Sequence, residues 1–128
     1  MTHKQARTSA APFDAELMLR RGREGHVTCD ETSDCLAIYE TAAQGATMKI
    51  VVPESDENGL TAEFAIEAAD TCDDDSYEEI ARSEPISDTG EYLVGFSTQR
   101  HYVRLVVEVE SEEIDLGRVV VGIVPLGI

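Results

Sequence analysis

The sequence predicts an all-β fold, a sandwich or a barrel, in a single domain. Stretches of alternating apolar and polar residues recur along the chain, turn-forming residues separate them, and no segment shows convincing helical spacing. At 128 residues the chain has the length of one domain. Aromatic residues make up 5% of it and tryptophan is absent, so the core must consist of valine, isoleucine, leucine and alanine.

The first half of the chain predicts an arm followed by short strands. Residues 1–13 are polar and small and lack periodicity, which predicts a flexible N-terminal arm ahead of one β-sandwich domain at residues 14–128. In residues 14–20 (DAELMLR), Asp14 could cap a short helix, but Leu17 and Leu19 alternate with Met18 and Arg20, and the β character of the rest of the chain favours a strand. Gly22, Gly25 and Asp30–Asp34 predict loop around a short piece at Val27–Cys29, and the next strand candidates are Leu36–Glu40 and Thr47–Val52.

The second half shows clearer alternation. Pro53–Gly59 (PESDENG) predicts a turn that ends in Asn-Gly, a pair that favours positive φ. Three strands should follow, separated by the acidic stretch Asp70–Ser76 and by the turn residues 85–90: Thr61–Ala69, Tyr77–Ala81 and Glu91–Ser97. With the C-terminal strands, the count is about eight.

The two most β-branched stretches are His101–Glu110 and Gly117–Val124. The first alternates strongly, which is typical of a half-buried strand, whereas the second has almost no polar residue and suits a strand covered on both faces. Only the short acidic segment Ser111–Leu116 separates them. We therefore expect the two strands to pair as an antiparallel hairpin that closes the chain.

The net charge of −16 restricts the choice of partner. The chain has 26 acidic and 10 basic residues, and it should repel nucleic acids and anionic membranes. Only two of the basic residues are lysines, a composition that suggests a saline setting in which salt screens the self-repulsion. No stretch has the about 20 apolar residues of a membrane helix, and no apolar region follows the N-terminal basic residues, so we expect synthesis in a cytoplasm without a signal peptide.

Five of the basic residues lie within residues 1–24, against three acidic ones. They could be solvated, or they could dock the arm on an acidic neighbour, including another copy of this chain. We take the second reading as the hypothesis and name as candidate partner-contact residues Lys4, Arg7, Arg20, Arg21 and Arg23. No aromatic residue sits among the arginines, which argues further against nucleic-acid binding.

The sequence predicts no enzyme and no cofactor. The three histidines are scattered, and no nucleophile, phosphate-binding or zinc motif occurs. Asp73, Asp74 and Asp75 are the best candidate calcium ligands, although their spacing does not match an EF-hand and acidic loops arise readily in such a chain. The odd count of three cysteines predicts buried free thiols, with a Cys29–Cys35 bridge as the alternative.

Two segments of the chain carry a resemblance to a known family. Residues 91–109 (EYLVGFSTQRHYVRLVVEV) and 115–125 (DLGRVVVGIVP) resemble the C-terminal half of small cement, or decoration, proteins of tailed-bacteriophage and prophage capsids. The matching features are Tyr102 and Arg104 at the start of a Leu/Val-rich strand, and a terminal G-x-V-x-x-G-I-V strand matched by Gly117, Val119, Gly122, Ile123 and Val124. Residues 14–20 resemble the family's first strand, whereas the acidic segment Ser111–Ile114 departs from its Gly/Thr/Ser-rich turn.

The resemblance implies a jelly-roll β-sandwich that forms a homotrimer on the outer surface of an icosahedral head. There it would bind the major capsid protein, bridge neighbouring capsid subunits and stabilise the shell, and its location would be the virion. The residues alone leave an alternative open, a β-sandwich recognition module that binds carbohydrate or a cell surface, with calcium at Asp73–Asp75. The lack of tryptophan argues against sugar stacking.

Overall fold

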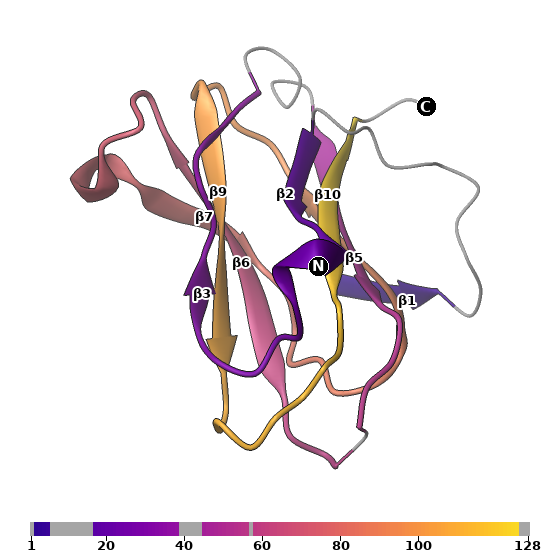
Figure 1. The fold of residues 1–128 in the computed structure, drawn as a ribbon. Helices are drawn as coiled ribbons and strands as arrows, with labels where there is room; N and C mark the ends of the chain where they lie inside the picture. Colours follow the sequence, from indigo (N-terminus) through magenta and orange to yellow (C-terminus); the bar gives the residue numbers. More distant parts are fainter. Residues whose placement is uncertain (1, 6–16, 39–44, 57, 126–128) are drawn as a thin grey trace.

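The computed structural model describes residues 2–5, 17–38, 45–56 and 58–125, which form two packed antiparallel sheets (Figure 1). Sheet A has the order β1-β8-β5-β10-β2, with bounds Thr2–Gln5, Gly90–Phe96, Ala46–Val52, Val120–Pro125 and Met18–Arg20. Sheet B has the order β3-β9-β6-β7, with bounds Glu31–Thr32, Tyr102–Val109, Ala62–Ala69 and Glu78–Arg82; β4 (Leu36–Ala37) also pairs with β9. Two short 3-10 turns, η2 (Gly22–Glu24) and η3 (Asp74–Ser76), complete the described elements.

The strand pairings are nested, and this gives the sandwich a jelly-roll topology. The innermost pair is the hairpin β6·β7, and around it follow β5·β8, then β3 and β4 with β9, then β2·β10. Successive pairs alternate between the two sheets, as the two Greek keys of a jelly roll require. The predicted antiparallel β-sandwich is therefore confirmed.

The predicted terminal hairpin is wrong. Both of its strands exist, but β9 lies in sheet B between β3 and β6, and β10 lies in sheet A between β5 and β2. The connection crosses from one sheet to the other and contributes Ile114, Leu116 and Val119 to the core, each at most 1% exposed. A segment that buries such side chains is not a solvent-exposed turn, and this is why short spacing did not produce pairing.

The alternation in the strands has the predicted consequence for the core. In β6 the face of Phe64 and Ile66 is fully buried, and in β8 the face of Tyr92 and Val94 is buried. In β9 the odd positions from 103 to 107 are buried. β10 departs from the expectation of two covered faces, because Val121 and Ile123 are buried whereas Val120 and Val124 are only partly so.

The first 38 residues differ most from expectation. Thr2–Gln5, within the expected arm, form β1, and Met18–Arg20 form the predicted first strand as β2; residues 6–16 lie outside the described part. Val27–Cys29 is not a strand, whereas β3 lies in the expected loop at Asp30–Asp34. Val27 is fully buried and exchanges backbone hydrogen bonds with Leu116 and Gly117. These bonds join the segment to the crossing connection.

The cysteine prediction is also wrong. Cys35 and Cys72 form a disulfide, and both are exposed, as is the free Cys29. The bond links the segment before β4 to the loop after β6, two places that are 37 residues apart and meet only in the folded sheet B. Among the described residues, no helix is long and apolar enough to cross a membrane.

Candidate functional site

The structure separates the five predicted contact residues. Arg20 is 2% exposed: its guanidinium donates two hydrogen bonds to the Glu31 carboxylate, at 2.8 and 3.0 Å, and one to the Val119 carbonyl at 2.8 Å. Arg20 thus joins the edge of sheet A to β3 of sheet B. The group is already enclosed and neutralised within its own chain, which leaves little of it for a partner.

Three of the other four predicted contact residues are described, and they lie at opposite edges of sheet A. Arg21 and Arg23 are exposed at η2, where the Arg21 backbone N–H donates to the Glu24 carboxylate at 2.7 Å. Lys4 lies in β1, at the opposite edge of sheet A, and its register partner is Tyr92. Arg7 lies outside the described residues. The structure therefore does not bring these residues together into one patch.

Arg82 organises the charges on the outer face of sheet B. Its guanidinium hydrogen-bonds Glu79 at 2.7 Å, Glu63 at 3.3 Å and also Glu108, so that β7, β6 and β9 are linked across the strands. The hydrogen bond with Arg82 lowers the pKa of Glu79, and the bonds to Glu79 and Glu108 raise the pKa of Arg82. Three carboxylates share one cation here, so this face keeps an excess of negative charge.

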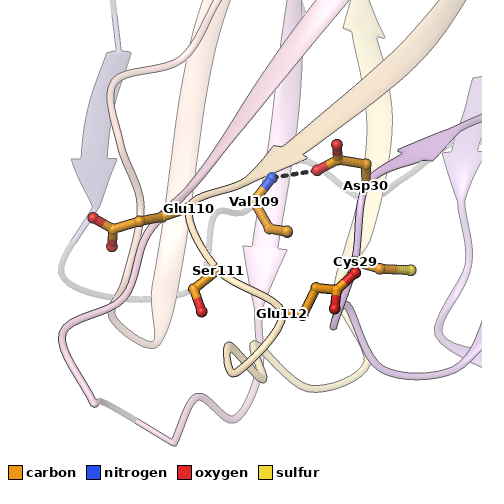
Figure 2. Close-up of a pocket in the computed structure, with 6 residues that line it drawn as sticks. All are labelled: Cys29, Asp30, Val109, Glu110, Ser111 and Glu112. Atoms are coloured by element: carbon orange, nitrogen blue, oxygen red, sulfur yellow. Dashed lines mark hydrogen bonds between the residues drawn. The ribbon is translucent and has the colours of Figure 1, made fainter.

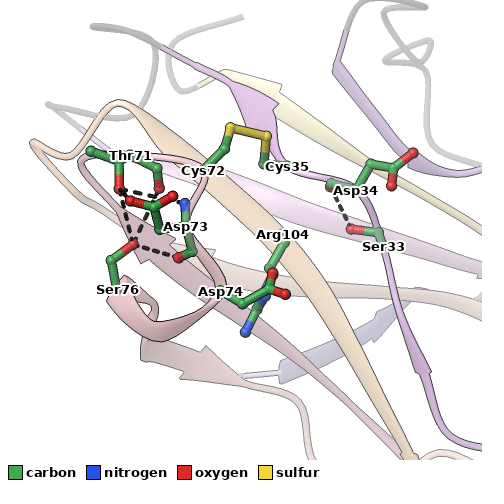
Figure 3. The surroundings of a disulfide bond; sticks show 9 residues. All are labelled: Ser33, Asp34, Cys35, Thr71, Cys72, Asp73, Asp74, Ser76 and Arg104. Carbon is green, nitrogen blue, oxygen red and sulfur yellow. Dashed lines mark hydrogen bonds and ion pairs between the residues drawn. A yellow bond between two sulfur atoms is a disulfide. The ribbon is translucent and has the colours of Figure 1, made fainter.

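Arg104 forms a second group beside the disulfide (Figure 3). It donates to Glu67 at 2.8 Å and to Asp74 at 3.1 Å, and it lies 4.0 Å above the ring of Tyr77. Burial raises the pKa of Tyr77, although the nearby Arg104 cation lowers it. The Tyr77 hydroxyl is buried without a hydrogen-bond partner among the described residues. Arg104 is one of the residues that carry the family resemblance. In the structure its hydrogen bond to Asp74 holds the loop between β6 and β7 against β9.

The predicted calcium ligands do not converge. Asp74 is engaged with Arg104, and the Asp73 carboxylate accepts a hydrogen bond from Thr71 at 3.3 Å (Figure 3). In the part of the chain that the structure describes, no group of three or more His, Cys, Asp or Glu side chains could hold a metal ion. The Asp73–Asp75 candidate is therefore not supported.

A shallow pocket lies beside the free thiol of Cys29 (Figure 2). Its polar lining is acidic and includes Asp30, whose carboxylate accepts the Val109 backbone N–H at 2.8 Å. Glu110, at the pocket rim, points away from Cys29. The residues that line this pocket include no cation or histidine that could activate the thiol, so their arrangement suggests no nucleophilic chemistry.

The side chains of His26 and Asp115 are hydrogen-bonded to each other, a contact that the sequence analysis did not predict. His26 Nδ1 lies 2.9 and 3.1 Å from the two Asp115 carboxylate oxygens, and both side chains are about half exposed. The Gly117 N–H, at 2.8 Å, is the main cause that lowers the Asp115 pKa, and His26 adds to it. A separate pocket is lined by His26, Asp115 and Ser55, but the Ser55 hydroxyl donates to the Ser87 carbonyl at 2.6 Å. The pair fastens the crossing connection to the segment after η2.

The outer face of sheet A contrasts with that of sheet B. The outward positions of β5, β8 and β10 alternate with the core positions, and they hold uncharged residues except for one ion pair, Lys49–Glu91, at 3.2 Å. Both members of that pair are at most 5% exposed, whereas the uncharged side chains are partly buried: Thr47, Val51, Leu93, Val120 and Val124. On a chain of net −16, this face carries no net charge.

The site therefore consists of two differently charged sheet faces and a basic N-terminal strand. Comparisons of the chain with protein-family models, curated proteins and solved structures found no match.

Proposed function

We propose that this chain is a capsid cement protein, which binds the outside of an icosahedral head of a tailed virus and bridges neighbouring major-capsid subunits. The observation that carries the proposal is the place of the segments that resemble such proteins. They contain β2, β8, β9 and β10, which take four of the eight jelly-roll positions and contribute to three of its four nested pairings. Of these four strands, β2 and β10 pair directly with each other, although about a hundred residues separate them in the sequence.

The construction of the domain supports a mechanical role. Arg82 and Arg104 are engaged by carboxylates of the same chain, and these links join neighbouring strands or hold a loop in place. The disulfide adds a covalent link between two segments at sheet B. A domain stiffened in this way suits a protein that must hold its shape under load.

The stabilising mechanism is linkage. A protein that binds the assembled shell but not its free subunits shifts the equilibrium toward the shell. A homotrimer presents each contact three times, and the attachment of one contact raises the effective concentration of the others. Because each copy has a net charge of −16, bound copies would repel one another, and specific contacts with the shell would have to hold them in place.

The composition of purified particles tests the proposal. Virions from a virus or induced prophage that encodes this chain should contain it at a copy number comparable to that of the major capsid protein. The control is a particle preparation from a strain in which the gene is deleted. Absence of the chain from intact particles would refute the proposal, and chelator-sensitive binding to a glycan surface would point to the recognition module instead.

A further inference from the structure

Strand β1 is an addition to the jelly roll. The four nested pairings close the two sheets without it, and β8 is its only partner among the described strand pairings. The register aligns Thr2 with Val94 and Gln5 with Glu91, so four residues of β1 cover the edge of β8 that faces away from β5. Without β1, this edge would present unpaired backbone groups, which accept any strand of suitable register.

The chain connects β1 to the far side of its own sheet. β1 and β2 are consecutive in the sequence, yet they form the two opposite edges of sheet A, with β8, β5 and β10 between them. Four strand spacings amount to about 19 Å. The twelve residues from 6 to 17 that join them can extend to about 40 Å. Chain length therefore allows β1 to reach a β8 edge outside its own domain.

Nothing in the pairing ties β1 to its own copy. β1 has the sequence Thr-His-Lys-Gln, without a large apolar residue, and its described attachment is the main-chain pairing with β8. The same backbone groups of Glu91–Val94 occur on every copy of the chain, and main-chain pairing does not distinguish between them.

Charge favours contact between an arm and a second copy. Residues 1–7 contain Lys4 and Arg7 and no acidic residue, which gives them a charge of +2. The remaining residues therefore carry −18, and the sum is the net charge of −16. A positive arm is attracted by the negative body of another copy. The outer face of sheet A, beside β8, has no net charge, whereas the face of sheet B around Arg82 has excess carboxylates. Electrostatic repulsion between two copies is therefore smallest when they approach each other through the outer face of sheet A, which contains β8.

We propose that copies of this chain exchange their N-terminal strands, so that Thr2–Gln5 of one copy pairs with Glu91–Val94 of a second copy. Such an exchange keeps every backbone hydrogen bond of the closed form and turns it into a link between copies. The exchanged copies form a closed ring when the rotation between neighbouring copies brings the last copy back to the first. The inference concerns the free protein and does not depend on attachment to a capsid.

Cross-linking of mixed variants tests the exchange. His3 and Leu93 lie directly opposite each other in the register, and opposite residues in an antiparallel pair are close enough for a disulfide. Two proteins carry one cysteine each, His3→Cys and Leu93→Cys, both in a Cys29→Ser background to remove the free thiol. They are unfolded and refolded together, oxidised with oxidised glutathione, and separated on a non-reducing gel with a size tag on one of them.

The exchange predicts that the mixed disulfide-linked dimer is the main cross-linked product. The matched control replaces the Leu93→Cys protein by Glu113→Cys, an exposed position in the crossing connection, and should yield at least tenfold less mixed dimer. A mixture that yields no more dimer than this control contradicts the proposal. So does a His3→Cys/Leu93→Cys double variant that cross-links only within single chains at the same concentration.

Removal of the strand gives a second readout. Deletion of residues 1–7 should convert the associated free protein to a monomer by sedimentation velocity, with cooperative melting retained because the nested pairings do not include β1. An unchanged sedimentation coefficient for a folded truncated protein would overturn the proposal. Neither experiment contains a capsid, so its outcome is separate from that of the cement function.

Discussion

The crossing connection between β9 and β10 depends on one glycine, and this gives the sharpest mutational prediction. Gly117 has a φ of +75°, and a Cβ added to it would lie 2.2 Å from the backbone carbonyl oxygen of Glu54. Two costs should add in Gly117→Ala. The left-handed backbone costs about 1 kcal/mol for a residue with a side chain. The contact with a main-chain atom forces two packed segments apart, which costs about 2–4 kcal/mol more.

Gly59→Ala is the matched control. Gly59 has a φ of +85°, close to that of Gly117, but an added Cβ would meet no atom within 4 Å. It should therefore show only the backbone cost of about 1 kcal/mol. The difference between the two variants isolates the close approach of the connection to Glu54.

The assay is urea unfolding followed by far-ultraviolet circular dichroism, without reductant so that the disulfide stays intact. Gly117→Ala should lose about 3–5 kcal/mol of unfolding free energy, and its melting temperature should fall by roughly 10–20 °C. Equal losses for Gly117→Ala and Gly59→Ala would refute the reasoning, because the connection would then not pack against residue 54 as described.

Four further predictions follow from particular contacts. Replacing Cys35 and Cys72 by serine should cost about 4 kcal/mol in urea unfolding, from the chain entropy of a loop of this length, and a loss under 1 kcal/mol would show that the bond does not form. Arg20→Met should cost about 2–3 kcal/mol because it leaves Glu31 unpaired, and Glu31→Leu added to it should restore part of the loss in the same assay. The pKa of Asp115 is lowered in the folded state, so its stabilisation exists above the unfolded value of 3.8 and is lost as the pH falls; Asp115→Asn should therefore flatten the drop in melting temperature below about pH 4, and an unchanged acid profile would contradict this. Added sodium chloride should raise the melting temperature of a chain of net −16, and a constant melting temperature would count against a saline setting.

The strands were predictable because alternation is local. β6 and β8 follow almost residue for residue from their apolar positions, since each must bury one face. β3 has only two residues, too few to alternate, and it was therefore expected as loop. Pairing is not local. The terminal hairpin was predicted from the short spacing of two good strands, and the buried Ile114 and Leu116 within the supposed turn were the available signal against it.

The candidate site was less predictable, because its contacts join distant residues. Arg20 and Glu31 are separated by eleven residues, His26 and Asp115 by 89, and Cys35 and Cys72 by 37. Among 26 acidic residues, the sequence gives no means of choosing the one that neutralises a given arginine. Arg20 is predicted to contact a partner because its charge can be read from the sequence, whereas the carboxylate that neutralises it, Glu31, cannot. The N-terminal arm contains β1 for a related reason: an edge strand can pair through its backbone without an apolar pattern.

Attachment to the shell is the most direct test of the central proposal. Purified protein is mixed with emptied, mature-sized shells of the major capsid protein of the virus or prophage that encodes it, and separately with the unassembled subunits, and each mixture is sedimented. A cement protein should pellet with the shells at a saturating, fixed ratio, should not bind the free subunits, and should raise the temperature at which the shells break. Failure to bind intact shells, or equal binding to free subunits without any gain in shell stability, would contradict the proposal.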